Sequence, residues 1–132
     1  MRLIYFLIVF LVACLLPSAT ANKEILAPLI FKSARIGVAS WYGPGFHGRK
    51  TASGIIFNQN EITVAHRTLP FGTMISITNL INGKTIMAPV LDRGPYTRKN
   101  GRYSRDVDLS YQAAKLLGAV EKGVVPILIK FN

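Results

Sequence analysis

Residues 74–91 read MISITNLINGKTIMAPVL, and this stretch is the clearest guide to the fold. Apolar and polar side chains alternate over residues 74–80, which is typical of a strand with one buried face. A second strand-like run follows over residues 85–91. Asn82 and Gly83 lie between the two runs, and both residue types tolerate the positive φ of a type I′ turn. The stretch therefore predicts a β-hairpin.

Strand-like runs bounded by glycine and proline continue on both sides of this hairpin. We expect further strands over residues 36–42, 62–66 and 124–131. One helix is expected over residues 111–117, because Ser110 can cap its start and Gly118 can end it. Five or six strands with one short helix indicate a mainly β fold, in the form of a small closed barrel, since closure removes exposed sheet edges.

The first 21 residues have the features of a secretory signal peptide. Arg2 supplies a positive charge, an apolar run covers residues 3–16, and small residues at 19–21 form a cleavage site. The apolar run is shorter than the roughly 20 residues that a membrane-spanning helix needs. We therefore expect an exported protein of the periplasm or cell envelope, in which residues 22–35 form a short leader or linker.

Cys14 is the single cysteine, and it allows a second interpretation of the N-terminus. Residues 11–14, LVAC, resemble a bacterial lipobox, in which the cysteine is lipidated and becomes the mature N-terminus. That processing would anchor the protein in the outer membrane as a lipoprotein. The residues after Cys14 are still apolar, which favours simple cleavage after Ala21 instead. In either case Cys14 has no partner for an intrachain disulfide.

The chain is strongly basic, with 16 Lys and Arg against 6 Asp and Glu and a formal net charge of +10. Such a charge attracts polyanions, including wall polymers and anionic lipid headgroups. An exported chain meets little nucleic acid, so nucleic acid is not the expected partner. A solubilising charge without a specific partner is the alternative.

Short segments rich in glycine, aromatic and polar residues follow one another along the chain. They are ASWYG at 39–43, TASG at 51–54, TVAHRTLPFG at 63–72, TNLING at 78–83, DRGPY at 92–96 and DLS at 108–110. In this order and spacing they resemble the barrel domain of the rare lipoprotein A family, over residues 36–132. The resemblance implies a six-stranded double-psi β-barrel with one short helix. Because the sequence ends just after the last strand, no additional C-terminal glycan-binding domain is expected.

That family consists of peptidoglycan lytic transglycosylases, so the resemblance also implies a reaction. Such enzymes cleave the β-1,4 bond between N-acetylmuramic acid (MurNAc) and N-acetylglucosamine (GlcNAc) without water. The muramoyl 6-hydroxyl attacks its own anomeric carbon and yields a 1,6-anhydro end. An acid must protonate the leaving oxygen and a base must take the hydroxyl proton, and one carboxyl can do both in turn. We expect peptidoglycan strands as the partner, a monomer, and no cofactor or metal ion.

Asp92 and His66 are the candidate catalytic residues. Asp92 ends a predicted strand directly before Arg93-Gly94-Pro95, where a turn would expose it in a groove. In the alternative interpretation, Asp92 pairs with Arg93 or caps the turn. His66 occupies the position of the family's functional histidine, where it would orient Asp92 or hydrogen-bond the sugar. A structural histidine at a strand end is the alternative there.

The sequence departs from the family pattern at one important place. The family usually has Glu after the glycine of the TASG segment, eleven residues before the histidine, and this chain has Ile55. Leu91 likewise replaces a common Asn, and Glu61 is the nearest carboxylate in sequence. Either the domain is a weak or inactive peptidoglycan binder, or Asp92 works alone. In the second case, apolar Ile55 and Leu91 would help its carboxyl stay protonated as the acid.

Aromatic and basic side chains near these positions are the candidate substrate contacts, since sugar faces stack on aromatic rings. Trp41 and Tyr42 face opposite sides of a strand, so we expect Trp41 in the core and Tyr42 in the groove. The predicted substrate-binding residues are Tyr42, Arg67, Arg93 and Tyr96. The arginines would grip peptide or lactyl carboxylates, or they simply form a solvated basic face.

Overall fold

The computed structural model describes residues 31–132 of the chain. The predicted signal segment at 1–21, the possible lipidation of Cys14 and most of the predicted leader at 22–35 lie outside that part. Within residues 31–132, no helix is both long and apolar enough to cross a membrane.

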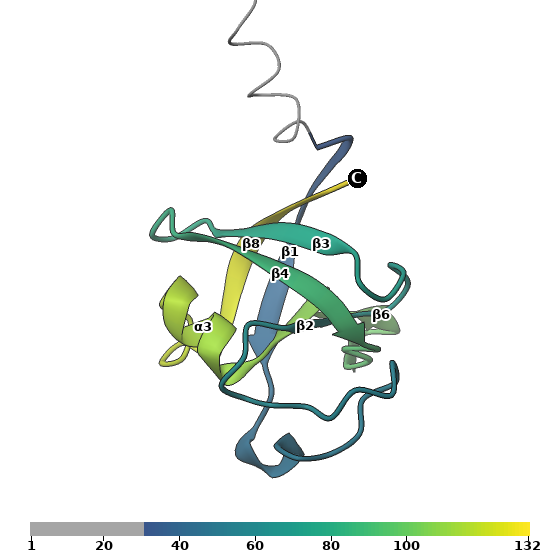
Figure 1. The fold of residues 1–132 in the computed structure, drawn as a ribbon. Coiled ribbons are helices and arrows are strands. Elements are labelled where there is room, and N and C mark those ends of the chain that lie inside the picture. The colour runs from purple at the N-terminus through teal and green to yellow at the C-terminus, as the bar shows by residue number, and fades with distance from the viewer. Residues whose placement is uncertain (1–30) are drawn as a thin grey trace, which may run out of the picture. The chain divides into compact units, whose positions relative to one another are not determined.

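Six strands close into a barrel, as the sequence predicts (Figure 1). They are β1 (Ser33–Trp41), β2 (Val64–His66), β3 (Met74–Asn79), β4 (Thr85–Asp92), β7 (Val107–Leu109) and β8 (Val124–Phe131). Their order around the barrel is β1-β7-β2-β4-β3-β8. The long antiparallel pairing of β1 with β8 closes the sheet, and it starts at Ser33, three residues before the predicted strand. The last strand has the predicted bounds.

The barrel mixes parallel and antiparallel pairs, and its interior is apolar. Strand β1 runs parallel to β7, and β2 runs parallel to β4, whereas the other neighbours are antiparallel. Side chains from all six strands meet in the core, including Ala39, Val64, Ile75, Ile77, Val90, Val107, Leu109, Ile127 and Ile129. Burial of this aliphatic set away from water is the main force that holds the domain together.

The predicted helix, α3 (Tyr111–Leu117), closes one end of this core. Its buried side chains Ala113, Ala114 and Leu117 pack into the same cluster as the strands. The side chain of Ser110 accepts a hydrogen bond from the Ala113 N–H, and Gly118 ends the helix at a φ of 65°. Both predicted boundary residues are confirmed.

The predicted hairpin forms between β3 and β4, but its turn is not type I′. Gly83 has a positive φ of 75°, whereas Asn82 does not. The Asn82 amide instead donates to the Leu117 carbonyl at 2.9 Å, and its side-chain oxygen accepts from the Lys84 N–H. The prediction was wrong at Asn82 because this side chain ties the hairpin to the end of the helix.

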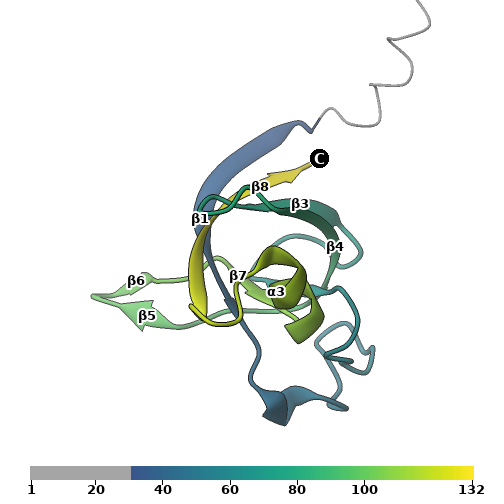
Figure 2. The same cartoon turned by 90° about the vertical axis from the view of Figure 1, so that its left-hand side faces the viewer.

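A type I′ turn does occur elsewhere, at a place the sequence analysis missed. Asn100 and Gly101 have φ values of 51° and 74°, and they join β5 (Arg98–Lys99) to β6 (Arg102–Tyr103). These two strands form a small sheet of their own, which projects from the barrel (Figure 2). A long connection between β1 and β2 carries the 3-10 helix η2 (Pro44–Phe46) and the bridge Lys50↔Ile56.

Candidate active site on the outer face of the barrel

The register of four neighbouring strands aligns polar side chains in one row. Ala65 of β2 pairs with Asp92 of β4 on one side and with Asp108 of β7 on the other. Asp108 in turn pairs with Ser40 of β1. Paired residues direct their side chains to the same face of a sheet. Residues that alternate with this row point into the core instead, namely Val64, Val107, Leu109 and Ala39. The row therefore lies on the outer face of the barrel wall.

A β-bulge places Asp92 in this row. Val64 pairs with Val90 and the next residue, Ala65, pairs with Asp92, so Leu91 is an extra residue on β4. Without the bulge, Asp92 would share the inward side of Val90. Bulges bend a strand and re-aim a side chain, and they are common beside active sites. Here the bulge turns Asp92 outward, together with Leu91.

Ala65 separates the two carboxyls and is itself buried, with 1% of its surface exposed. Adjacent strands are about 4.8 Å apart, so the Cα atoms of Asp92 and Asp108 are separated by roughly 10 Å across β2. The charge of Asp92 still acts across this separation and raises the pKa of Asp108.

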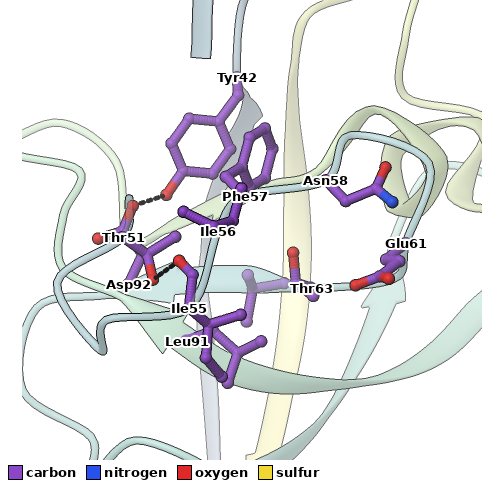
Figure 3. Close-up of a pocket in the computed structure, with 11 residues that line it drawn as sticks. Tyr42, Thr51, Ile55, Ile56, Phe57, Asn58, Glu61, Thr63, Leu91 and Asp92 are labelled. Carbon is purple, nitrogen blue, oxygen red and sulfur yellow. Dashed lines mark hydrogen bonds between the residues drawn. The ribbon is translucent and has the colours of Figure 1, made fainter. Parts of the chain in front are cut away.

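Three donors fix the Asp92 carboxylate. Its Oδ2 accepts from the Tyr42 hydroxyl at 2.8 Å (Figure 3), and its Oδ1 accepts from the backbone N–H groups of Ala52 and Arg93, each at 2.9 Å. The bond from Arg93 N–H is the predicted turn cap. The Arg93 guanidinium forms no ion pair with Asp92, because it donates to the carbonyls of His66 and Leu69. These three hydrogen bonds orient the Asp92 side chain.

Tyr42 is a permanent donor to Asp92. Burial raises the pKa of its phenol, and the hydrogen bond to Asp92 raises it further. Its ring packs against Phe57 and Phe46, with ring centroids 4.6 and 5.4 Å away. The hydroxyl therefore keeps its proton and a fixed direction.

Asp108 is the carboxyl that sequence reasoning missed as a site residue. Burial raises its pKa, and the nearby charge of Asp92 acts in the same direction. The Ser40 hydroxyl, which donates to Oδ1 at 2.8 Å, and the charge of Arg105 oppose this shift only in part. Asp108 was visible only as a member of the DLS segment, because its position beside Asp92 depends on a register that the sequence does not reveal.

Apolar side chains line the pocket next to Asp92. Ile55 and Leu91 both lie in it, as predicted, so the position where the family has Glu carries an aliphatic group (Figure 3). The Ile55 carbonyl accepts from the backbone N–H and the hydroxyl of Thr51, which holds the loop in place. Glu61 lines the same pocket, but it lies at the far end from Asp92, beyond Thr63.

His66 is directed away from the Asp92 row. It pairs with Val107, a core residue, and so faces the other side of the sheet from Ala65. Its Nδ1 accepts from the N–H groups of Thr68 and Leu69 at 3.1 Å each, which leaves the proton on Nε2 of a neutral ring. Burial and the nearby Arg67 lower its pKa. The described residues include no hydrogen bond between His66 and Asp92.

The predicted substrate-binding residues separate into two groups. Tyr42 joins Asp92, and Tyr96 is 59% exposed. Arg67 and Arg93 are instead tied to the protein: Arg67 bonds to Asp106 and to backbone carbonyls, and Arg93 lies over Phe71 as well as bonding to carbonyls. Within residues 31–132, no cluster of His, Cys, Asp or Glu is arranged to hold a metal ion.

Comparison with known proteins identifies relatives of this barrel. A family model described as "Lytic transglycolase" matches residues 34–129. The "Probable endolytic peptidoglycan transglycosylase RlpA" of Aquifex aeolicus is 56% identical over 94 residues, which covers 71% of this chain and 39% of that protein. The "Endolytic peptidoglycan transglycosylase RlpA" of Campylobacter jejuni is 44% identical over 94 residues, or 71% of this chain and 32% of that protein. The chain thus matches only about a third of the length of these relatives.

Two solved structures share the fold. The Streptomyces papain inhibitor matches with a TM-score of 0.59 and 25% identity, over 76% of this chain and 96% of that chain. A mutant expansin of Clavibacter michiganensis, solved with cellohexaose, matches with a TM-score of 0.55 and 22% identity, over 76% of this chain and 51% of that chain. Together with the family match, these likenesses confirm the predicted double-psi β-barrel.

Proposed function

This chain belongs to the rare lipoprotein A family of lytic transglycosylases, and from that premise we propose that it is an endolytic peptidoglycan transglycosylase. It cleaves MurNAc-GlcNAc β-1,4 bonds within glycan strands and leaves 1,6-anhydro-MurNAc ends. The observation that supports this most is the outer-face row, in which Asp92 and Asp108 flank the small side chain of Ala65.

The two carboxyls divide the proton transfers of this reaction. The MurNAc 6-hydroxyl attacks C1 of its own ring, and the bond from C1 to the GlcNAc oxygen breaks. Asp92, which accepts three hydrogen bonds as a carboxylate, takes the proton of the 6-hydroxyl. Asp108, whose pKa is raised by burial, is the acid that gives a proton to the departing oxygen. The proton then returns from Asp92 to Asp108 by exchange with solvent.

Tyr42 orients Asp92, the base, in this scheme. Its hydroxyl stays protonated and fixes one oxygen of Asp92, so the other oxygen and its lone pairs keep a set direction. Ile55 and Leu91 line the same side of the site with apolar side chains, which a bound glycan would cover. Such a lining would favour attack by the sugar hydroxyl over attack by water once the glycan is bound.

His66 acts as a positioning residue in this proposal. Its Nδ1 holds the N–H groups of Thr68 and Leu69, and Arg93 docks on the His66 and Leu69 carbonyls. Arg93 directly follows Asp92, so the turn that His66 stabilises sets the end of β4. His66 thereby influences Asp92 through Arg93 without touching the substrate.

A weak or inactive peptidoglycan binder is the second candidate function. Ile55 favours it, because an aliphatic side chain at the family's Glu position can neither donate nor accept a proton. Asp108, on another strand, supplies a second carboxyl that can transfer a proton in place of the family's Glu. We therefore favour the enzyme over the binder.

We also propose that the protein works in the periplasm or cell envelope, as a monomer on peptidoglycan strands. The composition of residues 1–21 supports export. Metabolic labelling with a radioactive fatty acid separates the two processing routes: a label that disappears in Cys14→Ala identifies a lipoprotein, and an unlabelled wild type identifies simple cleavage.

Digestion of purified peptidoglycan tests the activity. Wild type should release 1,6-anhydro-MurNAc products detected by mass spectrometry, and Asp92→Asn should lower their rate of formation by at least about 10²-fold. Glu121→Gln, the same kind of change at an exposed residue, is the matched control and should leave the rate unchanged.

Ile55→Glu separates the enzyme from the binder. The enzyme proposal expects anhydro products from wild type without this substitution. If only Ile55→Glu produces them, the natural protein is a binder and the proposed activity is wrong.

A further inference from the structure

The segment between Asp92 and Asp108 carries an unusual charge. We call residues 96–105, which include β5 and β6, the basic arm. It contains Arg98, Lys99, Arg102 and Arg105 and no acidic residue. Residues 96–103 are all exposed, and the two strands project from the barrel (Figure 2). Within the arm, only Ser104 and Arg105, directly before Asp106, are partly buried.

Two cations face each other across this small sheet. Lys99 pairs with Arg102 on either side of the Asn100-Gly101 turn, so their side chains lie on one face. Like charges directly opposite each other destabilise a strand pair. Neither side chain forms a salt bridge with any residue between 31 and 132, where Arg67–Asp106 is the recorded ion pair. An anion placed between Lys99 and Arg102 would remove this repulsion.

The arm is held rigidly, although it is exposed. The Tyr103 ring lies between two guanidinium groups, 4.3 Å from that of Arg67 and 4.4 Å from that of Arg98. Arg98 also donates to the Tyr103 hydroxyl at 2.9 Å. At the base, Arg67 donates to the carbonyls of both Pro95 and Arg105. Because the arm is already ordered, little conformational entropy is lost when its cations bind a ligand.

The arm is also fixed beside the two carboxyls of the outer-face row. It leaves β4 just after Asp92 and re-enters the barrel at β7 just before Asp108. We therefore expect a glycan strand that occupies the row to pass near the arm. Tyr96, which is 59% exposed and 6.4 Å from Tyr103 between ring centroids, adds an aromatic face there.

We propose that the basic arm binds carboxylates that hang from the glycan strand being cut, with Lys99 and Arg102 as the main contacts. This inference rests on the proposed function and extends it to substrate choice. Each MurNAc carries a lactyl group, which ends in a free carboxylate or in a peptide that bears carboxylates. Guanidinium and ammonium groups form charge-assisted hydrogen bonds with such groups. The arm thus makes the enzyme select an anionic wall glycan over a neutral glycan with the same β-1,4 backbone.

Binding measured without cleavage tests this inference. The full protein carrying Asp92→Asn is titrated by calorimetry with three ligands: strands with free lactyl carboxylates, strands with peptides, and a neutral chito-oligosaccharide of equal length. Adding Lys99→Gln and Arg102→Gln should weaken binding of at least one anionic strand by roughly 10-fold and leave the neutral ligand unaffected. These two side chains have no recorded hydrogen bond within residues 31–132, so the arm should keep its shape.

The matched control removes two exposed lysines far from the arm, Lys84→Gln with Lys122→Gln. Loss of affinity for free lactyl strands identifies the lactyl carboxylate as the ligand, and loss only for peptide-bearing strands identifies the peptide carboxylates. Unchanged binding of both anionic strands overturns the inference, and so does an equal loss in the lysine control. Because no cleavage is measured, a failure of the proposed activity would show separately as an absence of anhydro products from wild type.

Discussion

The rim of the barrel at the end of β2 and the outer face between β4 and β7 both carry aspartates, but they use them differently. At the rim, Asp106 accepts the Val38 N–H at 2.9 Å and pairs with Arg67 at 3.3 Å. Two residues later, Asp108 meets a hydroxyl from Ser40 and the charge of a second carboxylate. Within residues 31–132, the rim carboxylate forms a salt bridge, whereas neither Asp92 nor Asp108 does.

This difference indicates a structural role for Asp106 and a catalytic role for the aspartates of the outer face. A carboxylate paired with arginine and bonded to backbone holds elements together, and Asp106 joins β1 to the base of the arm. This contact leaves no room for a side chain at Gly37, because a Cβ there would lie 2.7 Å from the Asp106 Oδ2. Asp108 instead lies partly buried beside the charge of Asp92, and both effects raise its pKa. We therefore expect substitutions at the rim to affect folding and those at the outer face to affect catalysis.

The largest effect is expected from Asp108→Asn. The amide cannot supply the proton for the leaving oxygen, so kcat should fall by about 10²–10⁴-fold. The variant should melt no lower than wild type, because asparagine keeps a side-chain oxygen that can accept from the Ser40 hydroxyl. Rates of anhydro-MurNAc formation and thermal unfolding measured on one preparation check both statements. Activity within a few-fold of wild type would remove Asp108 from the mechanism.

Asp106→Asn should give the opposite result. Loss of its ion pair and weakening of its bond to Val38 should lower the free energy of unfolding by about 1–3 kcal/mol. Turnover per folded molecule should change little. Urea denaturation measures the stability, and Gly37→Ala should lower it in the same way. A stable but inactive Asp106→Asn protein would break the distinction between rim and outer face.

Tyr42→Phe should have an intermediate effect on catalysis. It removes one charge-assisted hydrogen bond to Asp92 and keeps the ring packed against Phe57. We expect roughly a 10-fold lower kcat. Steady-state kinetics on soluble glycan strands measure this effect. An unchanged kcat would show that Asp92 is oriented well enough by its backbone donors.

Substitutions at His66 should depend on whether the acceptor at Nδ1 is kept. His66→Asn offers an oxygen near that place for the Thr68 and Leu69 N–H groups, and His66→Ala does not. We expect His66→Ala to lose several-fold more kcat than His66→Asn. We also expect the acid limb of the pH–rate profile to stay in place for both variants. A shift of that limb would mean that His66 itself transfers a proton.

The smallest effect concerns stability and pH. Because burial raises the pKa of Asp108, the folded protein binds this proton more tightly than the unfolded chain. The resulting stabilisation is complete below about pH 4, the ordinary pKa of aspartate, and is lost as the pH rises through the raised value. Asp108→Asn should abolish this part of the pH dependence of unfolding. Identical pH profiles for the two proteins would contradict the raised pKa.

The sequence predicted most elements of the fold, because local signals decide them. The strand at residues 74–79, the Ser110 cap and the Gly118 stop all appear as expected, although Ser76 is buried along with Ile75 and Ile77. Two Asn-Gly pairs were present, however, and tertiary contact decided between them. Asn82 bonds to the helix end, while Asn100 is free to adopt the positive φ of the tight turn.

The candidate site was only partly predictable, because it depends on register. The sequence predicts both Asp92 and Tyr42 as site residues, and in the structure a hydrogen bond links them. Asp108 was missed, since only the pairing of Ala65 with both aspartates brings it to the site. Likewise, no sequence pattern shows that the bulge at Leu91 turns Asp92 to the outer face while His66 faces the other way.

A carboxyl titration of Asp108 by carbon NMR tests the central claim, that Asp92 and Asp108 act as a coupled pair, most directly. In wild type, Asp108 should titrate above the ordinary aspartate value of about 3.9. In Asp92→Asn its pKa should fall, because the neighbouring negative charge is gone. An Asp108 that titrates at the ordinary value, or at the same pH in both proteins, would contradict the account.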